Sequence, residues 1–108
     1  MNKEIKNSEL ELEILRNIEE NPKTTQRQLA KELGLSLGKT NYLIHALLVK
    51  GLVIVNNFRK SDNKLGYLYT LTPEGIDERA KLTILFLKRK SEEYNKLKKE
   101  MENMEINE

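Results

Sequence analysis

Residues 25–51, TQRQLAKELGLSLGKTNYLIHALLVKG, decide the fold of this chain of 108 residues. A capping box, in which a Thr and a Gln three residues apart cap each other's backbone, opens the stretch and predicts a helix over about 26–33. Gly34 ends that helix because glycine tolerates the left-handed conformation at a helix C-terminus. Ser36 then caps a second helix that runs to Gly51. Two short helices joined by so tight a turn form a helix-turn-helix.

A further helix is predicted before this unit. Ser8 and Glu11 form another capping box, and apolar residues at helical spacing follow until Pro22, which predicts a helix over about 9–20. Leu12 falls on the face opposite that apolar stripe. It is either an isolated exposed leucine, which is common, or part of a second packing surface for the C-terminal helix or a partner chain.

The residues after the second helix of the unit favour β-structure. Residues 52–58 contain Leu, Val, Ile and Phe, and residues 67–71 read YLYTL, so both are predicted as strands. A polar stretch, RKSDNK, joins them. The two strands therefore form a hairpin with a basic tip, whose cations are Arg59, Lys60 and Lys64.

A long helix is predicted at the C-terminus. Thr72 and Pro73 open it, because Thr favours the N-cap and Pro the first helical position. No Pro or Gly follows Gly75, so the helix is expected over 73–103, roughly 45 Å at ~1.5 Å per residue. A disordered tail is expected at 104–108. The remainder, at 8–75, is predicted to be the globular domain.

Apolar residues of this long helix fall into two rows of a heptad repeat. One row holds Ala80, Leu87, Tyr94 and Met101, and the other holds Ile76, Thr83, Lys90, Leu97 and Met104. A domain this small cannot cover such a helix, so we expect dimerisation through Leu87, Tyr94, Leu97 and Met101. The alternative is a partly frayed, solvated helix with only its first two turns docked. The sequence leaves both parallel and antiparallel pairing open.

Length and composition exclude several classes of protein. A chain of 108 residues suits one domain with an appended helix, and 38% hydrophobic residues suffice for a core. No apolar run is long enough for a membrane span or a signal peptide, so we expect a cytoplasmic protein without membrane contact. There is no Cys and one His, His45, so the sequence predicts no disulfide, metal site or cofactor.

Charge is distributed unevenly along the chain, although the net charge is only +2. Residues 1–24 carry −2, residues 25–71 carry +5 and residues 72–108 carry −1. A basic middle between nearly neutral ends is typical of a chain that meets phosphate with one face.

Two motifs in the turn resemble catalytic or nucleotide-binding signatures, and both fail on context. Residues 34–38, GLSLG, match the nucleophile elbow G-x-S-x-G, but a helix precedes them and the only His lies within the helix that follows. Residues 34–40, GLSLGKT, are one residue shorter than a P-loop, and no strand precedes them. The sequence therefore predicts no catalytic residue and no enzyme activity.

The second helix of the unit instead offers a surface suited to DNA. At 100° per residue, its apolar residues cluster on one side, and an amide, an aromatic hydroxyl, an imidazole and an ammonium lie on or beside the other. Asn, Lys and His hydrogen-bond base edges, and a glycine permits close approach to phosphate. Besides the hairpin cations, the expected DNA contacts are Ser36, Gly38, Lys39, Asn41, Tyr42 and His45.

Four segments together resemble the MarR-type winged-helix regulators, and more narrowly a short branch associated with exopolysaccharide loci. They are QLAKELGLS at 28–36, LIHAL at 43–47, KGLV at 50–53 and LTPEG at 71–75. The resemblance implies an α+β winged helix-turn-helix that binds double-stranded DNA as a homodimer and regulates transcription. The chain departs from the family in the wing, where Asp62-Asn63-Lys64 replaces a common Asp-x-Arg. The lysine ammonium, a point charge, thus stands in place of an arginine that could donate two hydrogen bonds at once.

Larger members of that family build their dimer, and often a pocket for small aromatic ligands, from longer terminal helices. This chain has a single C-terminal helix, so a small-molecule effector is left open. The main rival function is a winged helix that binds an acidic protein partner instead of DNA.

Overall fold

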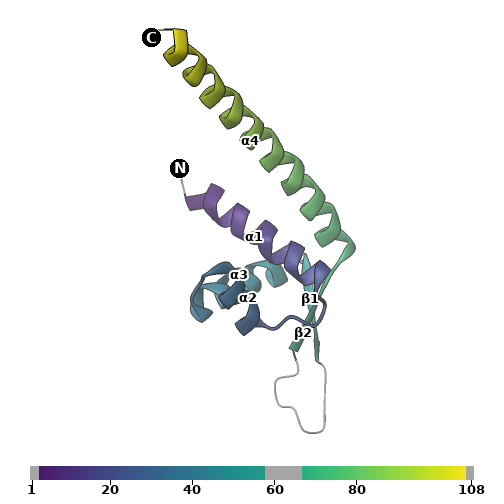
Figure 1. Cartoon of the computed structure of the whole chain (residues 1–108). Coiled ribbons are helices and arrows are strands. Elements are labelled where there is room, and N and C mark those ends of the chain that lie inside the picture. The colour runs from purple at the N-terminus through teal and green to yellow at the C-terminus, as the bar shows by residue number, and fades with distance from the viewer. Residues whose placement is uncertain (1–2, 58–66, 107–108) are drawn as a thin grey trace.

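The structure, a computed structural model, describes the backbone of residues 3–57 and 67–106. The order of elements in these residues is α1 (Lys3–Glu20), α2 (Gln26–Leu33), α3 (Leu37–Val49), β1 (Val53–Asn57), β2 (Tyr67–Leu71) and α4 (Pro73–Ile106). The first three helices and the antiparallel hairpin form one body, from which α4 extends (Figure 1). The predicted α+β winged helix-turn-helix is thus confirmed.

The core lies where α1 and α3 meet each other and the hairpin. Side chains that are almost completely buried there include Ile14, Leu15, Leu29, Leu43, Leu47 and Val53. Burying each such side chain contributes about 1.5–3 kcal/mol, and this apolar packing fixes the face that α3 turns inward.

Helix α1 begins earlier than the sequence indicated. It starts at Lys3, so Ser8 lies inside the helix and the expected start at residue 9 is wrong. Residues 3–7 contain no Gly or Pro to end a helix, so the turn at Ser8 continues in the N-terminal direction. Its C-terminal end at Glu20 agrees with the prediction.

The caps of the helix-turn-helix are formed as predicted. The Thr25 hydroxyl accepts a hydrogen bond from the Gln28 backbone N–H at 3.1 Å, and the Gln28 side chain accepts one from the Thr25 N–H at 3.0 Å. Gly34 ends α2 with φ 68°, and its N–H donates to the carbonyls of Ala30 and Lys31. These local bonds fix both ends of α2 and hence the direction in which the chain enters α3.

The hairpin pairs β1 with β2 in antiparallel register, from Val53 opposite Leu71 to Asn57 opposite Tyr67. Val53 and Tyr69 are buried, whereas Ile54 and Thr70 are exposed, in the alternation expected of strands with one covered face. The expected cations of the tip, Arg59, Lys60 and Lys64, lie outside the described residues.

Helix α4 has 34 residues, so it is about 51 Å long. Its first half packs on α1, where Leu82 and Phe86 join the same buried cluster as Leu12. This settles the two alternatives for Leu12, since it faces the C-terminal helix. The second half of α4 runs on past the end of α1 (Figure 1).

The end of α4 corrects the expected tail. Residues 104–106 belong to the helix, although the sequence was expected to become disordered from 104. No Gly or Pro interrupts them, and Met and Glu are good helix formers, so the helix continues. Residues 107–108 lie outside the described part of the chain.

The start of α4 is joined closely to the end of α3. The Thr72 hydroxyl donates to the Gly51 carbonyl at 2.7 Å, and the Thr72 N–H donates to the Leu52 carbonyl at 3.0 Å. The Gly75 N–H donates in turn to the Thr72 hydroxyl at 3.0 Å. A Cβ at Gly75 would overlap the Leu52 carbonyl oxygen, so only glycine allows this close approach.

Candidate nucleic-acid interface

Helix α3 is held by its N-cap and by one buried threonine. The Ser36 hydroxyl accepts a hydrogen bond from the Lys39 N–H at 3.0 Å, as predicted for the N-cap. The Thr40 hydroxyl, which is fully buried, donates to the Ser36 carbonyl at 2.9 Å. The first turn of α3 is therefore anchored from both sides, and its outward side chains have defined positions.

The two faces of α3 differ sharply in exposure. Thr40, Leu43, Ile44 and Leu47 form the buried face. On the opposite side Gly38, Asn41, Tyr42, His45 and Val49 are exposed, and the Tyr42 side chain is 59% exposed. The predicted division of the helix is thus present in the structure, and α3 contains no Asp or Glu.

Gly38 lies in the first turn of α3 and faces open space. A Cβ added there would meet no heavy atom within 4 Å. The fold of this chain therefore does not require a glycine at this position. The missing side chain leaves the helix N-terminus, with its unpaired backbone N–H groups, open to an approaching anion.

Lys39 is oriented by two neighbours, one of which the sequence did not indicate. Its Nζ donates to Asn7 Oδ1 at 3.2 Å, and the same nitrogen lies 5.4 Å from the centroid of the Tyr42 ring. Asn7 comes from α1, 32 positions away. The ammonium is thus held beside the exposed face of α3 rather than extended freely into solvent.

A second neighbour contributes a polar group to this face. Asn41 Nδ2 lies 3.4 Å from Gln26 Oε1, at the start of α2. Gln26 was missed in the sequence because helix periodicity concerns residues of one helix, and these two are 15 positions apart. The structure therefore adds Gln26 and Asn7 to the polar groups around α3.

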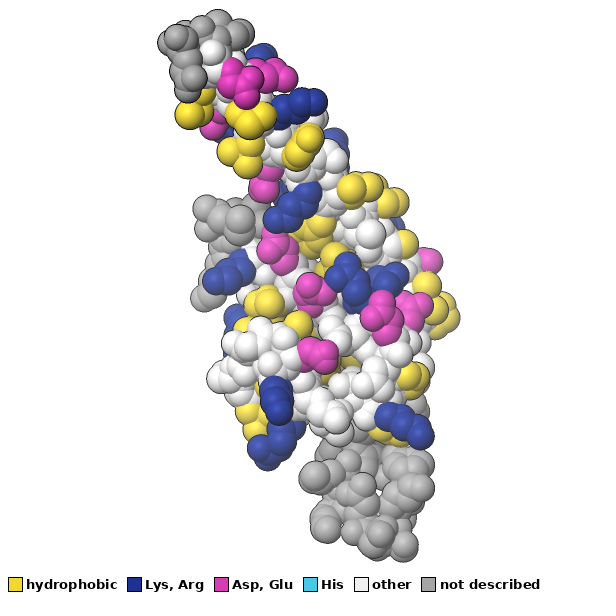
Figure 2. All heavy atoms as spheres, in the orientation of Figure 1, with side chains coloured by type: hydrophobic (Ala, Val, Ile, Leu, Met, Phe, Trp, Pro, Cys, Tyr) yellow, Lys and Arg dark blue, Asp and Glu magenta, His cyan; other side chains and the backbone are white. Residues whose placement is uncertain are grey.

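The residues expected to mediate dimerisation lie on α4, away from the exposed face of α3. The side chains of Leu87, Tyr94, Leu97 and Met101 are 66, 64, 64 and 52% exposed. Hydrophobic side chains are visible along the free part of α4 in Figure 2. They lie on a well-formed helix, so the fraying in the alternative reading is not seen between residues 76 and 104.

Together, a helix-turn-helix, a hairpin that extends from it and an outward-facing α3 define the winged helix-turn-helix class of protein. Residues 7–54 match the family model described as winged helix-turn-helix DNA-binding. No curated protein sequence matches the chain.

Solved structures of the same fold include regulators bound to DNA. The Staphylococcus aureus MepR–DNA complex superposes with a TM-score of 0.70 at 19% identity, covering 99% of this chain and 74% of that one. Streptococcus pneumoniae FabT in complex with DNA gives 0.58 at 24% identity, covering 80% and 58%. These likenesses establish the shared fold.

A third structure, Staphylococcus aureus MarR in complex with salicylate and kanamycin, gives a TM-score of 0.62 at 21% identity, covering 80% of this chain and 56% of that one. The chain therefore spans little more than half the length of that protein. Its structural neighbours are MarR-family regulators, as the resemblance in sequence implied.

No helix among the described residues is both long enough and apolar enough to span a bilayer. Within the same residues, no group of three or more His, Asp or Glu side chains is placed to hold a metal ion.

Proposed function

We propose that this protein binds double-stranded DNA as a homodimer through α3 and regulates transcription. The observation that carries the proposal is the exposed face of α3, which presents polar side chains and an open helix N-terminus and contains no acidic residue. Such a face fits a major groove, where side chains reach base edges.

The proposed contacts divide into two kinds. Asn41, Tyr42 and His45 reach base edges and set sequence preference, because base edges carry the sequence information. The first turn of α3, with Ser36, Gly38 and Lys39, meets the phosphate backbone. In the wing, Arg59, Lys60 and Lys64 follow phosphates or enter the minor groove.

A homodimer is part of this proposal, because one winged domain buries only about 600–1,000 Å² of surface on DNA. Two copies double the contact and read a site of twofold symmetry. The exposed apolar residues of α4, Leu87, Tyr94, Leu97 and Met101, supply the interface.

The genes under control are proposed from the sequence resemblance alone. The segments shared with the exopolysaccharide-associated branch support regulation, as a repressor, of polysaccharide biosynthesis genes. Selection of bound fragments from genomic DNA checks this point, and recovery of sites unrelated to such genes would contradict it.

The test of DNA binding is fluorescence anisotropy with a labelled random duplex over a series of salt concentrations. We expect binding that weakens linearly in log–log form as salt rises, because phosphate contacts release counterions. Absence of binding at low salt would overturn the proposal and favour a protein-binding module.

Two variants separate the roles of the contacts. Lys64→Ala should weaken specific and random DNA alike and flatten the salt slope by ~0.9. Asn41→Ala should change the preferred sequence in a selection from random duplexes. If Lys64→Ala changes the preference and Asn41→Ala does not, the assignment of base and phosphate contacts is wrong.

A further inference from the structure

The two apolar rows of α4 are open along the whole length of the helix. Near the domain, the side chain of Ile76 is 49% exposed, and Ala80 and Thr83 are also exposed. At the far end Met104 is 67% exposed. The domain of the same chain therefore covers no part of these rows, although it packs against the first half of the helix.

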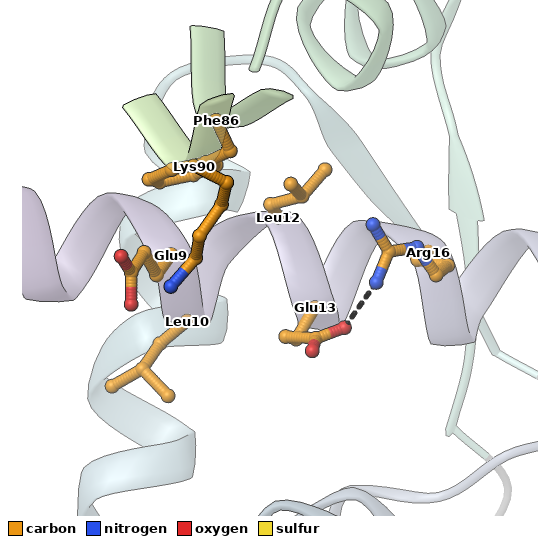
Figure 3. A pocket seen from close by; sticks show the side chains of 7 residues that line it. All are labelled: Glu9, Leu10, Leu12, Glu13, Arg16, Phe86 and Lys90. Carbon is orange, nitrogen blue, oxygen red and sulfur yellow. Dashed lines mark hydrogen bonds and ion pairs between the residues drawn. The ribbon is translucent and has the colours of Figure 1, made fainter. Parts of the chain in front are cut away.

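The domain packs on a different side of α4. Leu82 and Phe86, which α1 buries, lie roughly 80° around the helix from the centre of the rows. Between α1 and α4 there is a groove of about 410 Å³, lined on the α4 side by Phe86 and Lys90. Figure 3 shows Lys90 reaching from α4 across this groove toward Glu9 and Leu10 of α1. Since Lys90 also belongs to a row, a helix packed along the rows would cover that side of the groove.

We propose that the rows receive α4 of a second copy in antiparallel orientation, with Ala80 facing Leu97 of the partner subunit. This inference rests on the homodimer of the proposed function and adds its geometry. In an antiparallel coiled coil, each residue of one row faces a residue of the other row. The layers are then Ile76 with the partner's Met101, Ala80 with the partner's Leu97, Thr83 with the partner's Tyr94, and Leu87 with the partner's Lys90.

Side-chain size supports this alignment. The small residues of the rows, Ala80 and Thr83, lie in the first half of α4, and large residues such as Tyr94 and Leu97 lie in the second half. Antiparallel pairing places each small residue opposite a large one, which fills the layers evenly. Parallel pairing would place Ala80 opposite Ala80 of the partner subunit and leave space between the helices.

Lys90 supports the same orientation. In a parallel pair it would face Lys90 of the partner subunit, so two ammonium groups would share one core layer, which is unfavourable. In the antiparallel pair its stem packs on the partner's Leu87. Its Nζ lies 3.9 Å from Glu93 Oε1 of the same helix, so the charge has a partner outside the layer.

The charged residues that flank the two rows also favour the antiparallel orientation. The antiparallel alignment places Asp77 near Lys98 of the partner subunit, and by symmetry the pair occurs twice. Asp77 and Lys98 are both exposed. Arg79, which binds Glu19 at 3.0 Å, lies near the partner's Glu100. A parallel pair would bring Glu93 close to the partner's Lys98 but Glu100 close to the partner's Glu105, so its attractive and repulsive pairs would offset each other.

Cysteine cross-linking tests the orientation, because the chain has no Cys of its own. In the antiparallel pair, positions 80 and 97 of the two chains face each other, whereas identical positions lie about 26 Å apart, well beyond disulfide reach. We therefore expect that Ala80→Cys and Leu97→Cys each fail to cross-link alone. A mixture of the two variants, one of them tagged, should yield a cross-linked heterodimer under oxidation. Lys88→Cys, on the opposite face, is the control and should not cross-link.

Charge reversal gives an independent readout. Asp77→Lys and Lys98→Asp should each raise the dimer dissociation constant roughly five- to tenfold at low salt, because two attractive pairs become repulsive. The double variant restores both pairs and should recover the original dissociation constant. In a parallel dimer the two positions are about 31 Å apart, so no recovery would occur.

The outcomes separate this inference from the proposed function. Sedimentation at the mass of one chain, 12.6 kDa, would overturn the homodimer itself. A dimer in which Ala80→Cys or Leu97→Cys cross-links alone, or in which the double reversal fails to recover, overturns only the antiparallel arrangement.

Discussion

Two glycines of this chain have opposite reasons for lacking a side chain. Around Gly75 the backbone of the same chain leaves no room for a Cβ, because the Leu52 carbonyl occupies that position. Around Gly38 there is open space. The first is therefore explained by folding, whereas the second would be explained by the DNA contact that we propose for α3.

The variant Gly38→Ala tests that explanation. It should leave the free energy of unfolding unchanged or raise it by about 0.5 kcal/mol, because Ala has the higher helix propensity. DNA affinity should nevertheless fall, on the order of tenfold, because the methyl group holds the helix N-terminus away from phosphate. Urea unfolding and anisotropy measure the two quantities. Unchanged affinity would show that phosphate does not approach here.

The variant Gly75→Ala should behave in the opposite way. Its Cβ overlaps a backbone carbonyl that already accepts a hydrogen bond from Thr72, so the start of α4 must move. We expect a loss of about 3 kcal/mol in the free energy of unfolding, as for other overpacked sites. Thermal or urea denaturation checks this, and a loss below ~0.5 kcal/mol would mean that the corner adjusts easily.

At the level of secondary structure, the sequence predicted what short-range chemistry determines. The ends of α2 and the start of α3 follow from Thr25, Gly34 and Ser36, whose bonds reach only a few residues along the chain. The predicted start of α1 was wrong because the capping pattern at Ser8 competes with a longer helix, and no local signal decides between the two.

The candidate site shows the same limit. Rotation around α3 predicted which of its side chains are exposed, because that depends only on helix geometry and on the apolar stripe. It could not predict that Asn7 holds Lys39 or that Gln26 bonds Asn41, since these neighbours come from other helices. Such contacts depend on how the helices pack, which periodicity within one helix does not determine.

The N-cap of α3 offers a test at this scale. Ser36→Ala removes the acceptor of the Lys39 N–H and should cost about 1 kcal/mol of stability. Ser36→Asp keeps an acceptor and should retain stability, but its negative charge should weaken DNA binding through repulsion of phosphate. Comparing unfolding and DNA affinity for both variants separates the cap from the contact. Equal DNA affinity for Ser36→Asp and the parent chain would place Ser36 away from phosphate.

At the scale of the whole molecule, the two halves of α4 differ in whether the domain of the same chain covers them. Its first half shares the core of the domain through Leu82 and Phe86, and its second half has no such cover. Heptad periodicity predicted the exposed rows. The contact of Leu12 with α4 had to be left open in the sequence, because it depends on the packing of α1 against a helix about 70 residues later.

The dimer is tested without disturbing the domain by changing the uncovered half of α4. Tyr94→Asp together with Leu97→Asp should convert a dimer to a monomer at micromolar concentration, because two charges per chain enter the apolar seam. Lys88→Gln with Asn95→Asp, on the opposite face, changes the charge by the same amount, so it is the matched control and should stay dimeric. Sedimentation velocity reads the mass. A dimer that persists in the first variant is built elsewhere.

The contact between the start of α4 and the residues that follow α3 determines how the two helices can move relative to each other. Hydrogen bonds from Thr72 join the start of α4 to Gly51 and Leu52, the residues that directly follow α3, and Gly75 packs against the Leu52 carbonyl. The long helix is therefore connected directly to the end of α3, the helix that we propose to meet DNA. In the proposed dimer, a small change in the angle at which the two α4 helices cross would move both copies of α3 together, so the spacing of the two copies on DNA would be set where the long helices cross.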